Sequence, residues 1–353
     1  MNPELIQQAG KRLPPGRRRP VALSQQGLVK TDYLEGDSRL PLVIQPRVDG
    51  VNLAAWAGAS REFIEAQLLQ HGALLFQNFK VNTLGEFEKF VRAVCGDMME
   101  YRERSSPRSQ MGERVYTSTD YPEDQSIFPH NEHSYSRTFP TKLFFSCITA
   151  AESGGETPLA DTRRVLARIN PQIRKRFVEK NWMLVRNYGH GLGLPWQTVF
   201  RTTERAVVEQ YCRREGIETM WLDGDRLRTR QVRPVGISHQ RTGEWTWFNH
   251  ATFFHVSTLA PSIREALLSE FTEEELPNNS YYGDGTAIEP DVLEELREAY
   301  RQAAVSFPWQ AGSVILLDNI LTAHARNPFT GPRKILFAMA DPFTRTDYAI
   351  DRA

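Results

Sequence analysis

The chain has 353 residues, more than one small core requires and compatible with a single large, decorated domain. Hydrophobic residues make up 40% of it, including seven Trp and nineteen Phe, which provides for a sizeable core and argues against global disorder. Lys plus Arg equal Asp plus Glu at 43 each, so no net field favours nucleic acid or an anionic membrane.

The first 38 residues differ in composition from the rest of the chain. They are rich in Pro, Arg and Gln, as in "KRLPPGRRRP", and they show little apolar periodicity. The RRR run could contact a nucleic acid or an acidic partner, but we favour a solvated arm that lies over the domain. We therefore predict a flexible N-terminal arm over residues 1–38 and one domain over residues 39–353.

Apolar patterning begins directly after this arm. "PLVIQP" (41–46) is a short apolar run bounded by prolines and predicts a strand, and "ALLFQNF" (73–79) predicts a buried strand. Apolar residues at helical spacing predict two amphipathic helices, over 60–72 and 83–96, each ending at a glycine.

Strand-like runs dominate the centre and the end of the chain. Short apolar runs separated by turn residues predict strands over 142–150, 182–188, 244–257, 312–320 and 334–340. Helices are predicted between them, over 162–180, 205–216 and 291–305. This order favours a mainly β fold with helical decoration (α+β), either an antiparallel barrel or a double-sheet jelly roll, over regular βαβ alternation.

Three cysteines, Cys95, Cys147 and Cys212, lie far apart and form no C-x-x-C pair. We expect buried thiols in a reducing cytoplasm. The N-terminus lacks the apolar region of a signal peptide, and no run approaches the roughly 18 apolar residues that span a bilayer. The sequence therefore predicts a cytoplasmic location.

The stretch "SIFPHNEHSY" (126–135) combines two histidines with a glutamate. Residues i and i+2 of a strand point to the same face, so His130 and Glu132 can reach one ion while His133 points away. A third ligand is available in His324, which follows a late apolar strand. Two imidazoles and one carboxylate form the facial triad of non-haem Fe(II) oxygenases, but H-x-E alone is a weak signal because it arises often by chance.

Two further motifs support an oxygenase site. In "ESGGETPLAD" the Gly154-Gly155 pair allows a tight backbone, and Thr157 offers a hydroxyl to a bound carboxylate. In "NPFTGPRKI", Arg333 could grip a carboxylate with two parallel hydrogen bonds. Read alone, the glycine pair is an ordinary hairpin turn and Arg333 an ordinary surface charge.

Five motifs in this order carry a specific resemblance: "HNEHSY", "GGETPLADTR", "TGEWTWFNH", "NNSYYGDG" and "LLDNILTAHARNPFTGPRKILFAMA". Together they resemble the TauD/TfdA family of Fe(II)/2-oxoglutarate dioxygenases, and most of all its SyrP-type branch, close to the clavaminate-synthase-like enzymes. The likeness runs from about Leu40 to Phe343. It implies a double-stranded β-helix core, the distorted jelly roll of this superfamily.

The resemblance also implies the roles of individual residues. His130, Glu132 and His324 match the iron ligands of the family. Thr157 matches the threonine that binds a carboxylate of 2-oxoglutarate, and Arg333 is the best match for its arginine partner. The implied cofactor and cosubstrates are Fe(II), 2-oxoglutarate and O2.

The chain departs from the family's pattern at two places. Relatives commonly read H-G-R at the distal histidine, whereas this chain reads H-A-R from His324, a change that should leave the ligand intact. Several members carry a further arginine four residues beyond the 2-oxoglutarate arginine, but Phe337 stands four residues after Arg333. The 2-oxoglutarate residue is therefore Arg333 or Lys334, with Arg326 less favoured.

Three further residues are candidates for binding the substrate. Asn131 lies between two of the predicted ligands, Arg186 could grip a substrate carboxylate, and Asn249 recurs in the branch that the chain resembles. The alternative interpretation is that such residues are polar groups at the edge of the core, satisfied by backbone hydrogen bonds.

The implied chemistry is decarboxylation of 2-oxoglutarate to succinate and CO2, coupled to hydroxylation of an unactivated C–H bond. The presence of Glu132 argues against halogenation, because halogenases of the superfamily vacate this position for chloride. The branch suggests an amino-acid or peptide-derived substrate in the biosynthesis of a specialised metabolite such as an antibiotic. That substrate could be tethered to a peptide-synthetase carrier protein, which the basic arm could dock.

Three alternatives stay open at the sequence level. The same chemistry could hydroxylate or desaturate a free small amino acid or dipeptide. A jelly-roll binding protein without turnover would keep the scaffold, although intact ligands speak against it. A zinc hydrolase would need a general base beside the metal and no cosubstrate arginine.

Overall fold

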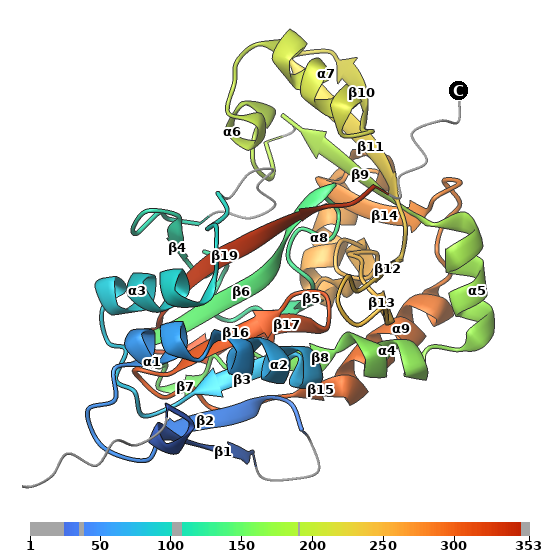
Figure 1. Cartoon of the computed structure of the whole chain (residues 1–353). Helices are drawn as coiled ribbons and strands as arrows, with labels where there is room; N and C mark the ends of the chain where they lie inside the picture. The colour runs from blue at the N-terminus through green and yellow to red at the C-terminus, as the bar shows by residue number, and fades with distance from the viewer. Residues whose placement is uncertain (1–24, 35–38, 101–107, 190, 347–353) are drawn as a thin grey trace, which may run out of the picture.

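The larger of two facing sheets has seven strands in the order β1-β2-β3-β16-β6-β19-β4 (Figure 1). The computed structural model describes residues 25–34, 39–100, 108–189 and 191–346. The strands of this sheet are β1 (Val29–Tyr33), β2 (Leu42–Pro46), β3 (Ala73–Phe76), β4 (Val115–Thr117), β6 (Thr138–Thr149), β16 (Val314–Asp318) and β19 (Lys334–Thr344). Neighbouring strands are antiparallel except for β2 and β3, which run parallel.

The smaller sheet has four antiparallel strands in the order β15-β8-β17-β5. These strands are β5 (Ile127–His130), β8 (Leu159–Asp161), β15 (Ala304–Val305) and β17 (Thr322–Arg326). The chain passes from β16 of the larger sheet to β17 of the smaller one through residues 319–321 alone. Two sheets joined in this way confirm the double-sheet jelly roll predicted from the sequence.

Strands β6, β16 and β19 are apolar on both faces because both faces are covered. Successive side chains of a strand alternate between faces. Phe144 and Leu316 join the core under the N-terminal helices. Phe145, the residue after Phe144, and Phe337 of β19 point to the opposite face and pack with Leu159 of the smaller sheet. The strands therefore read as continuous apolar runs, as those over 142–150, 312–320 and 334–340 do.

Three helices cover the outer face of the larger sheet: α1 (Leu53–Ala59), α2 (Arg61–His71) and α3 (Leu84–Val94). Gly72 ends α2 with a φ of 75°, a left-handed conformation that glycine adopts without strain. Thr83 and Glu86 form a capping box at the start of α3, whereas its C-cap is Cys95 rather than the predicted Gly96.

The helix predicted over 162–180 is two helices, α4 (Thr162–Arg168) and α5 (Pro171–Lys180). The break falls at Asn170, because proline disfavours helical backbone in the residue before it. Asn170 instead caps α5 by accepting a hydrogen bond from the Gln172 backbone. The predicted helix over 291–305 forms as α9 (Pro290–Ala303), which packs beside α4.

A second four-stranded sheet, β10-β11-β9-β14, projects from the core at the top of Figure 1. It consists of β9 (Trp182–Tyr188), β10 (Glu218–Leu222), β11 (Arg226–Arg233) and β14 (Asn278–Tyr282), with α6 (Trp196–Phe200) and α7 (Arg205–Arg214) beside it. The remaining elements are β7 (Ser153–Gly154), β12 (Gly236–Ser238), β13 (Trp245–Trp247), β18 (Phe329–Thr330), α8 (Pro261–Glu270) and the 3-10 turns Gln25–Leu28, Val256–Thr258 and Glu273–Glu275.

The strand predicted over 244–257 was wrong beyond Trp247. After β13 the chain turns, because the Asn249 side chain accepts a hydrogen bond from the Ala251 backbone at 3.0 Å and so competes with sheet pairing. The aromatic residues that suggested a strand, such as Phe254, are instead buried in a loop.

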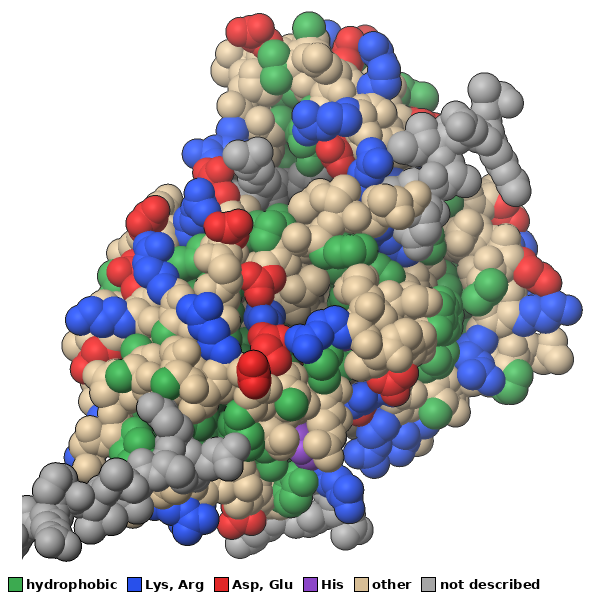
Figure 2. Space-filling view, in the orientation of Figure 1, with side chains coloured by type: hydrophobic (Ala, Val, Ile, Leu, Met, Phe, Trp, Pro, Cys, Tyr) green, Lys and Arg blue, Asp and Glu red, His purple; other side chains and the backbone are tan. Residues whose placement is uncertain are grey.

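Most of the predicted N-terminal arm, residues 1–24 and 35–38, lies outside the described residues. Within the arm, Val29–Tyr33 forms β1 and pairs with β2 at the edge of the larger sheet. All three cysteines are buried, as predicted. No helix of the described part of the chain is both long and apolar enough to cross a membrane. Cationic and anionic side chains are interspersed on the face shown in Figure 2, in line with the balanced composition.

We expect Phe144→Ala to lower the free energy of unfolding by about 3–5 kcal/mol, because it opens a cavity in a close-packed core. Phe144 is fully buried and lies edge-on to Phe90 at 6.0 Å between ring centroids. Denaturant unfolding measures the loss. Val178→Ala is the control, since this side chain is 54% exposed and its truncation should cost no more than about 0.5 kcal/mol. Equal stability of the two variants would contradict the packing described here.

Candidate metal centre

Two histidines from distant parts of the chain meet across the smaller sheet. His130 is the last residue of β5, and His324 lies in the middle of β17. The two are direct partners in the antiparallel ladder between these strands. Their ring centroids lie 4.4 Å apart, and both side chains are buried. Strand pairing thus brings together two of the three predicted ligands.

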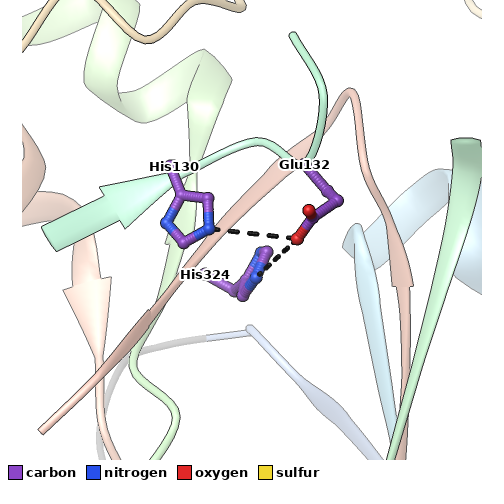
Figure 3. A group of neighbouring side chains, drawn as sticks. All are labelled: His130, Glu132 and His324. Carbon is purple, nitrogen blue, oxygen red and sulfur yellow. Dashed lines mark ion pairs between the residues drawn. The ribbon is translucent and has the colours of Figure 1, made fainter. Parts of the chain in front are cut away.

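Glu132 does not lie on a strand, so the alternation argument for its direction was wrong. β5 ends at His130, and Glu132 occupies the turn that follows. Asn319 holds this turn: its Oδ1 accepts from the Glu132 N–H at 2.8 Å, and its Nδ2 donates to the Glu132 carbonyl at 2.9 Å. The carboxylate Oε2 then lies 4.0 Å from His130 Nε2 and 3.7 Å from His324 Nε2 (Figure 3).

This donor set fits a divalent iron. One ligand atom from each of His130, Glu132 and His324 lies within 4.8 Å of the others. His130 Nδ1 is 2.9 Å from the Phe128 carbonyl, which fixes the proton on Nδ1 and leaves the Nε2 lone pair directed at Glu132. Burial lowers the pKa of both histidines, so the rings are neutral. Two neutral imidazoles and a carboxylate are the ligands of the facial triad in non-haem Fe(II) oxygenases.

Arg108 is a site residue that the sequence analysis missed. Its guanidinium donates to Glu132 Oε2 at 2.9 Å, and both side chains are almost fully buried. Burial acts to raise the pKa of Glu132, but the positive charge of Arg108, with His133 next, outweighs it and holds this pKa below its usual value. Arg108 belongs to no recognised motif, so no signal in the sequence pointed to it.

A small cavity of about 30 Å³ lies beside His324 and contains both predicted 2-oxoglutarate residues. Thr157 Oγ1 accepts a hydrogen bond from Trp309 Nε1 at 3.1 Å. Arg333 donates to the Gly155 carbonyl at 2.9 Å and to Ser118 Oγ at 3.2 Å. Burial lowers the pKa of Arg333 to about 10, so its guanidinium stays charged at neutral pH.

The two alternatives to Arg333 are placed differently. Lys334 is exposed at the start of β19. Arg326 lines the small cavity, but its guanidinium donates to the backbone carbonyls of Tyr121, Pro122 and Gln125 and so holds the loop before β5. Arg333 is therefore the candidate whose position and contacts suit a carboxylate best.

The Gly154-Gly155 pair is required by the close approach of two backbones. β7 pairs with β18, and a Cβ on Gly154 would lie 2.1 Å from the Pro328 carbonyl oxygen. A Cβ on Gly155 would lie 3.0 Å from Arg333 Nε. Both glycines also have positive φ. The motif therefore serves to bring the Gly155 carbonyl against the Arg333 guanidinium.

A larger cavity of about 320 Å³ lies on the other side of His130 and Glu132. Its walls are mainly apolar, and they include Ile127, Phe128, Phe253, Phe254, Leu259 and Leu267. Four of the described residues line both cavities: Arg108, Thr119, Ile127 and His130. The candidate metal centre thus lies where the small cavity that contains Arg333 and the larger cavity meet.

The three predicted substrate residues do not line either cavity within the described part of the chain. Asn131 is fully buried and donates to the Asn319 carbonyl. Asn249 donates to the Val235 carbonyl at 2.7 Å. Arg186 lies on β9, with its guanidinium 5.1 Å from the Tyr188 ring centroid. The contacts of Asn131 and Asn249 are hydrogen bonds to backbone carbonyls, as the structural interpretation expects.

We expect Asn319→Ala to weaken metal binding by about 10- to 100-fold, because the turn that carries Glu132 loses the side chain that holds it. Calorimetric titration with Mn(II) under nitrogen measures the affinity. Asn52→Ala is the control: Asn52 caps α1 by accepting from the Ala55 N–H at 2.9 Å, so its loss should cost about 1 kcal/mol of stability without changing metal affinity. Unchanged affinity in the Asn319 variant would refute the positioning role.

Comparisons with known proteins agree with this geometry. Residues 37–339 match the family model described as taurine catabolism dioxygenase TauD, TfdA family. The chain is 38% identical over 279 residues to the dapdiamide synthesis protein DdaC of Enterobacter agglomerans, covering 79% of this chain and 85% of the relative. It is 28% identical over 294 residues to a clavaminate synthase-like protein of Arabidopsis thaliana, covering 79% and 84%.

Solved structures with the same fold include PvcB of Pseudomonas aeruginosa, with a TM-score of 0.53 at 14% identity over 88% of this chain and 90% of that one. AAD-2, solved with Mn(II) and N-oxalylglycine, gives a TM-score of 0.50 at 13% identity over 88% and 96%. At such identities these likenesses concern the fold alone. The family match and the curated relatives carry the assignment: the chain belongs to the TauD/TfdA family and is an Fe(II)/2-oxoglutarate-dependent dioxygenase.

Proposed function

We propose that this dioxygenase hydroxylates an unactivated C–H bond of an amino-acid or peptide-derived substrate in the biosynthesis of a specialised metabolite. The observation that carries the proposal is that the two cavities meet at His130, with Glu132 in the wall of the larger cavity and His324 in the wall of the smaller one. One cavity has the size and charge for the end of a small anion, and the other has the volume of a small-molecule site. The relative at 38% identity is named for dapdiamide synthesis, which supports a biosynthetic role.

In this proposal His130, Glu132 and His324 bind Fe(II) through two ring nitrogens and one carboxylate oxygen. Iron, when bound, supplies the O2-dependent oxidation of 2-oxoglutarate and the transfer of an oxygen atom to the substrate. The chain's own contribution is to hold the ligands in a fixed arrangement. The two hydrogen bonds between the Asn319 side chain and the Glu132 backbone, and the one that His130 donates to the Phe128 carbonyl, do this.

Thr157 and Arg333 bind the distal carboxylate of 2-oxoglutarate. Arg333 is held by Gly155 and Ser118 on one side, so its guanidinium is oriented before the cosubstrate arrives. A charged donor in a cavity screened from solvent makes hydrogen bonds roughly twice as strong as neutral ones. The small cavity therefore selects a keto acid that carries a second carboxylate.

The substrate occupies the larger cavity. Its aromatic and aliphatic walls favour an apolar segment and exclude water, while the few polar side chains, among them Thr119 and Asn278, orient the molecule. Oxidation of a carrier-tethered aminoacyl group and oxidation of a free amino acid or dipeptide are both compatible with these walls. The N-terminal arm that could dock a carrier lies outside the described residues.

Mass spectrometry separates these substrate forms. The protein is incubated with Fe(II), 2-oxoglutarate and O2, and with either a loaded carrier protein or the corresponding free amino acids and dipeptides. We expect the gain of one oxygen atom and stoichiometric succinate in one arm. Oxidation of the free compounds alone would remove the carrier form. Absence of succinate from every arm, with metal bound, would leave a non-catalytic binding protein.

We expect Arg333→Met to weaken 2-oxoglutarate binding by about 10- to 100-fold, the range for a lost charge-assisted hydrogen bond. Binding of pyruvate, which has the keto acid but no distal carboxylate, should not change. Anaerobic titration of the Fe(II) protein with both keto acids measures the effect. Lys334→Met is the matched control, because the neighbouring side chain is exposed and should affect neither affinity. A parallel loss of pyruvate binding would refute the assignment of Arg333 to the distal end.

A further inference from the structure

Arg108 occupies a position that the proposed roles of the other site residues do not explain. We infer that Arg108 binds the metal-proximal carboxylate of 2-oxoglutarate and bridges it to Glu132. This inference rests on the proposed function and extends it to the end of the cosubstrate that Thr157 and Arg333 do not reach.

The first support is the position of Arg108 relative to the two cavities. It is one of the four described residues that line both, and among these it is the one with a permanent charge. 2-Oxoglutarate carries a carboxylate at each end. Arg333 lines the small cavity alone, whereas Arg108 lines both, so a second guanidinium where the cavities meet supplies a cation for the other carboxylate.

The second support is the way in which the guanidinium is fixed. One terminal nitrogen of Arg108 donates to Glu132 Oε2 at 2.9 Å. The guanidinium carbon Cζ lies over the Phe337 ring, 4.0 Å from its centroid. Phe337 packs against Phe145, which in turn contacts the His324 ring at 5.0 Å. A guanidinium held on one edge and one face is oriented in advance for a planar carboxylate.

The third support is the balance of charge around one oxygen atom. Glu132 Oε2 faces the ring nitrogens of His130 and His324 and also accepts the hydrogen bond from Arg108. Bound Fe(II) would place a second cation at the same oxygen. Within the described part of the chain, Glu132 is the one carboxylate that lines either cavity. Buried charges require compensation, and a keto-acid carboxylate between the metal and Arg108 provides it.

The closing experiment compares two keto acids in Arg108 and Arg333 variants. Arg108→Met, Arg108→Gln and Arg333→Met are first titrated with Mn(II), and keto-acid binding is then followed at saturating Fe(II) under nitrogen. The visible charge-transfer absorbance of the Fe(II) keto-acid complex reports binding without turnover. The control is Arg92→Met, which removes an exposed ion pair with Glu113, and neither of these residues lines either cavity.

We expect both Arg108 variants to lose affinity for 2-oxoglutarate and pyruvate by the same factor, about 10- to 100-fold, because the two share the proximal carboxylate. Their preference for 2-oxoglutarate over pyruvate should persist, whereas Arg333→Met should abolish it. The glutamine variant keeps a hydrogen-bond donor beside Glu132, so it tests the lost charge should the methionine variant fail to fold or to bind metal.

Wild-type affinity for both keto acids in a metal-bound Arg108 variant overturns the inference. A rise in KM for the substrate, with keto-acid binding unchanged, also overturns it and assigns Arg108 to the substrate instead. These results are distinct from a failure of the proposed function, which would appear as a wild-type protein that forms no keto-acid complex at all.

Discussion

The antiparallel pairing of β17 with β5 is the constraint on which the candidate metal centre depends. It makes His324 the direct partner of His130 across the ladder. Directly opposed residues have Cβ atoms about 4.5–5.5 Å apart, close enough for two imidazoles to share one ion. A slip of the register by one residue would turn His324 to the opposite face of the sheet. The site therefore exists only in one register of this pair.

The register is fixed from both sides of β17. β8 pairs with the other edge of the strand, and Thr322 at its start donates to the Gly72 carbonyl at 2.9 Å. Before it, Asp318 Oδ1 accepts from the backbones of Ile320 and Leu321, which shapes the connection from β16. The same connection carries Asn319, which holds the turn of Glu132. One link between the two sheets thus positions ligands that lie far apart in the sequence.

The sequence predicted which residues cluster at the candidate site, but it predicted less well which local structure positions them. His130, Glu132 and His324 were predicted from the H-x-E pair and a late histidine, with support from several motifs in family order, and they do cluster. The strand argument for Glu132 was wrong, since a turn held by a tertiary hydrogen bond directs it. Asn319 could have been noticed in the sequence, because the polar pair Asp-Asn ends the apolar run of β16.

Other features could not be read from local patterns. Arg108 depends on contacts with Glu132 and with Phe337 of β19, and a lone arginine outside a motif carries no sign of such contacts. The same limit explains the substrate residues, because Asn131 and Asn249 satisfy backbone groups rather than line a cavity. Aromatic residues after Trp247 resembled a strand, yet side-chain hydrogen bonds to the backbone turned the chain there.

The two cavities offer different kinds of contact to a bound molecule. Arg108 and Arg333 line the small cavity, and in the proposed function their guanidinium groups recognise the charge and planar shape of carboxylates. The larger cavity is mainly apolar, and apolar contacts discriminate weakly between similar molecules, by about 1–3 kcal/mol for a methylene group. Since the charges on the face in Figure 2 are mixed, no single-sign field over it steers a partner. In the proposed function, directional contacts that select a substrate come from the few polar side chains of this cavity wall, such as Thr119 and Asn278.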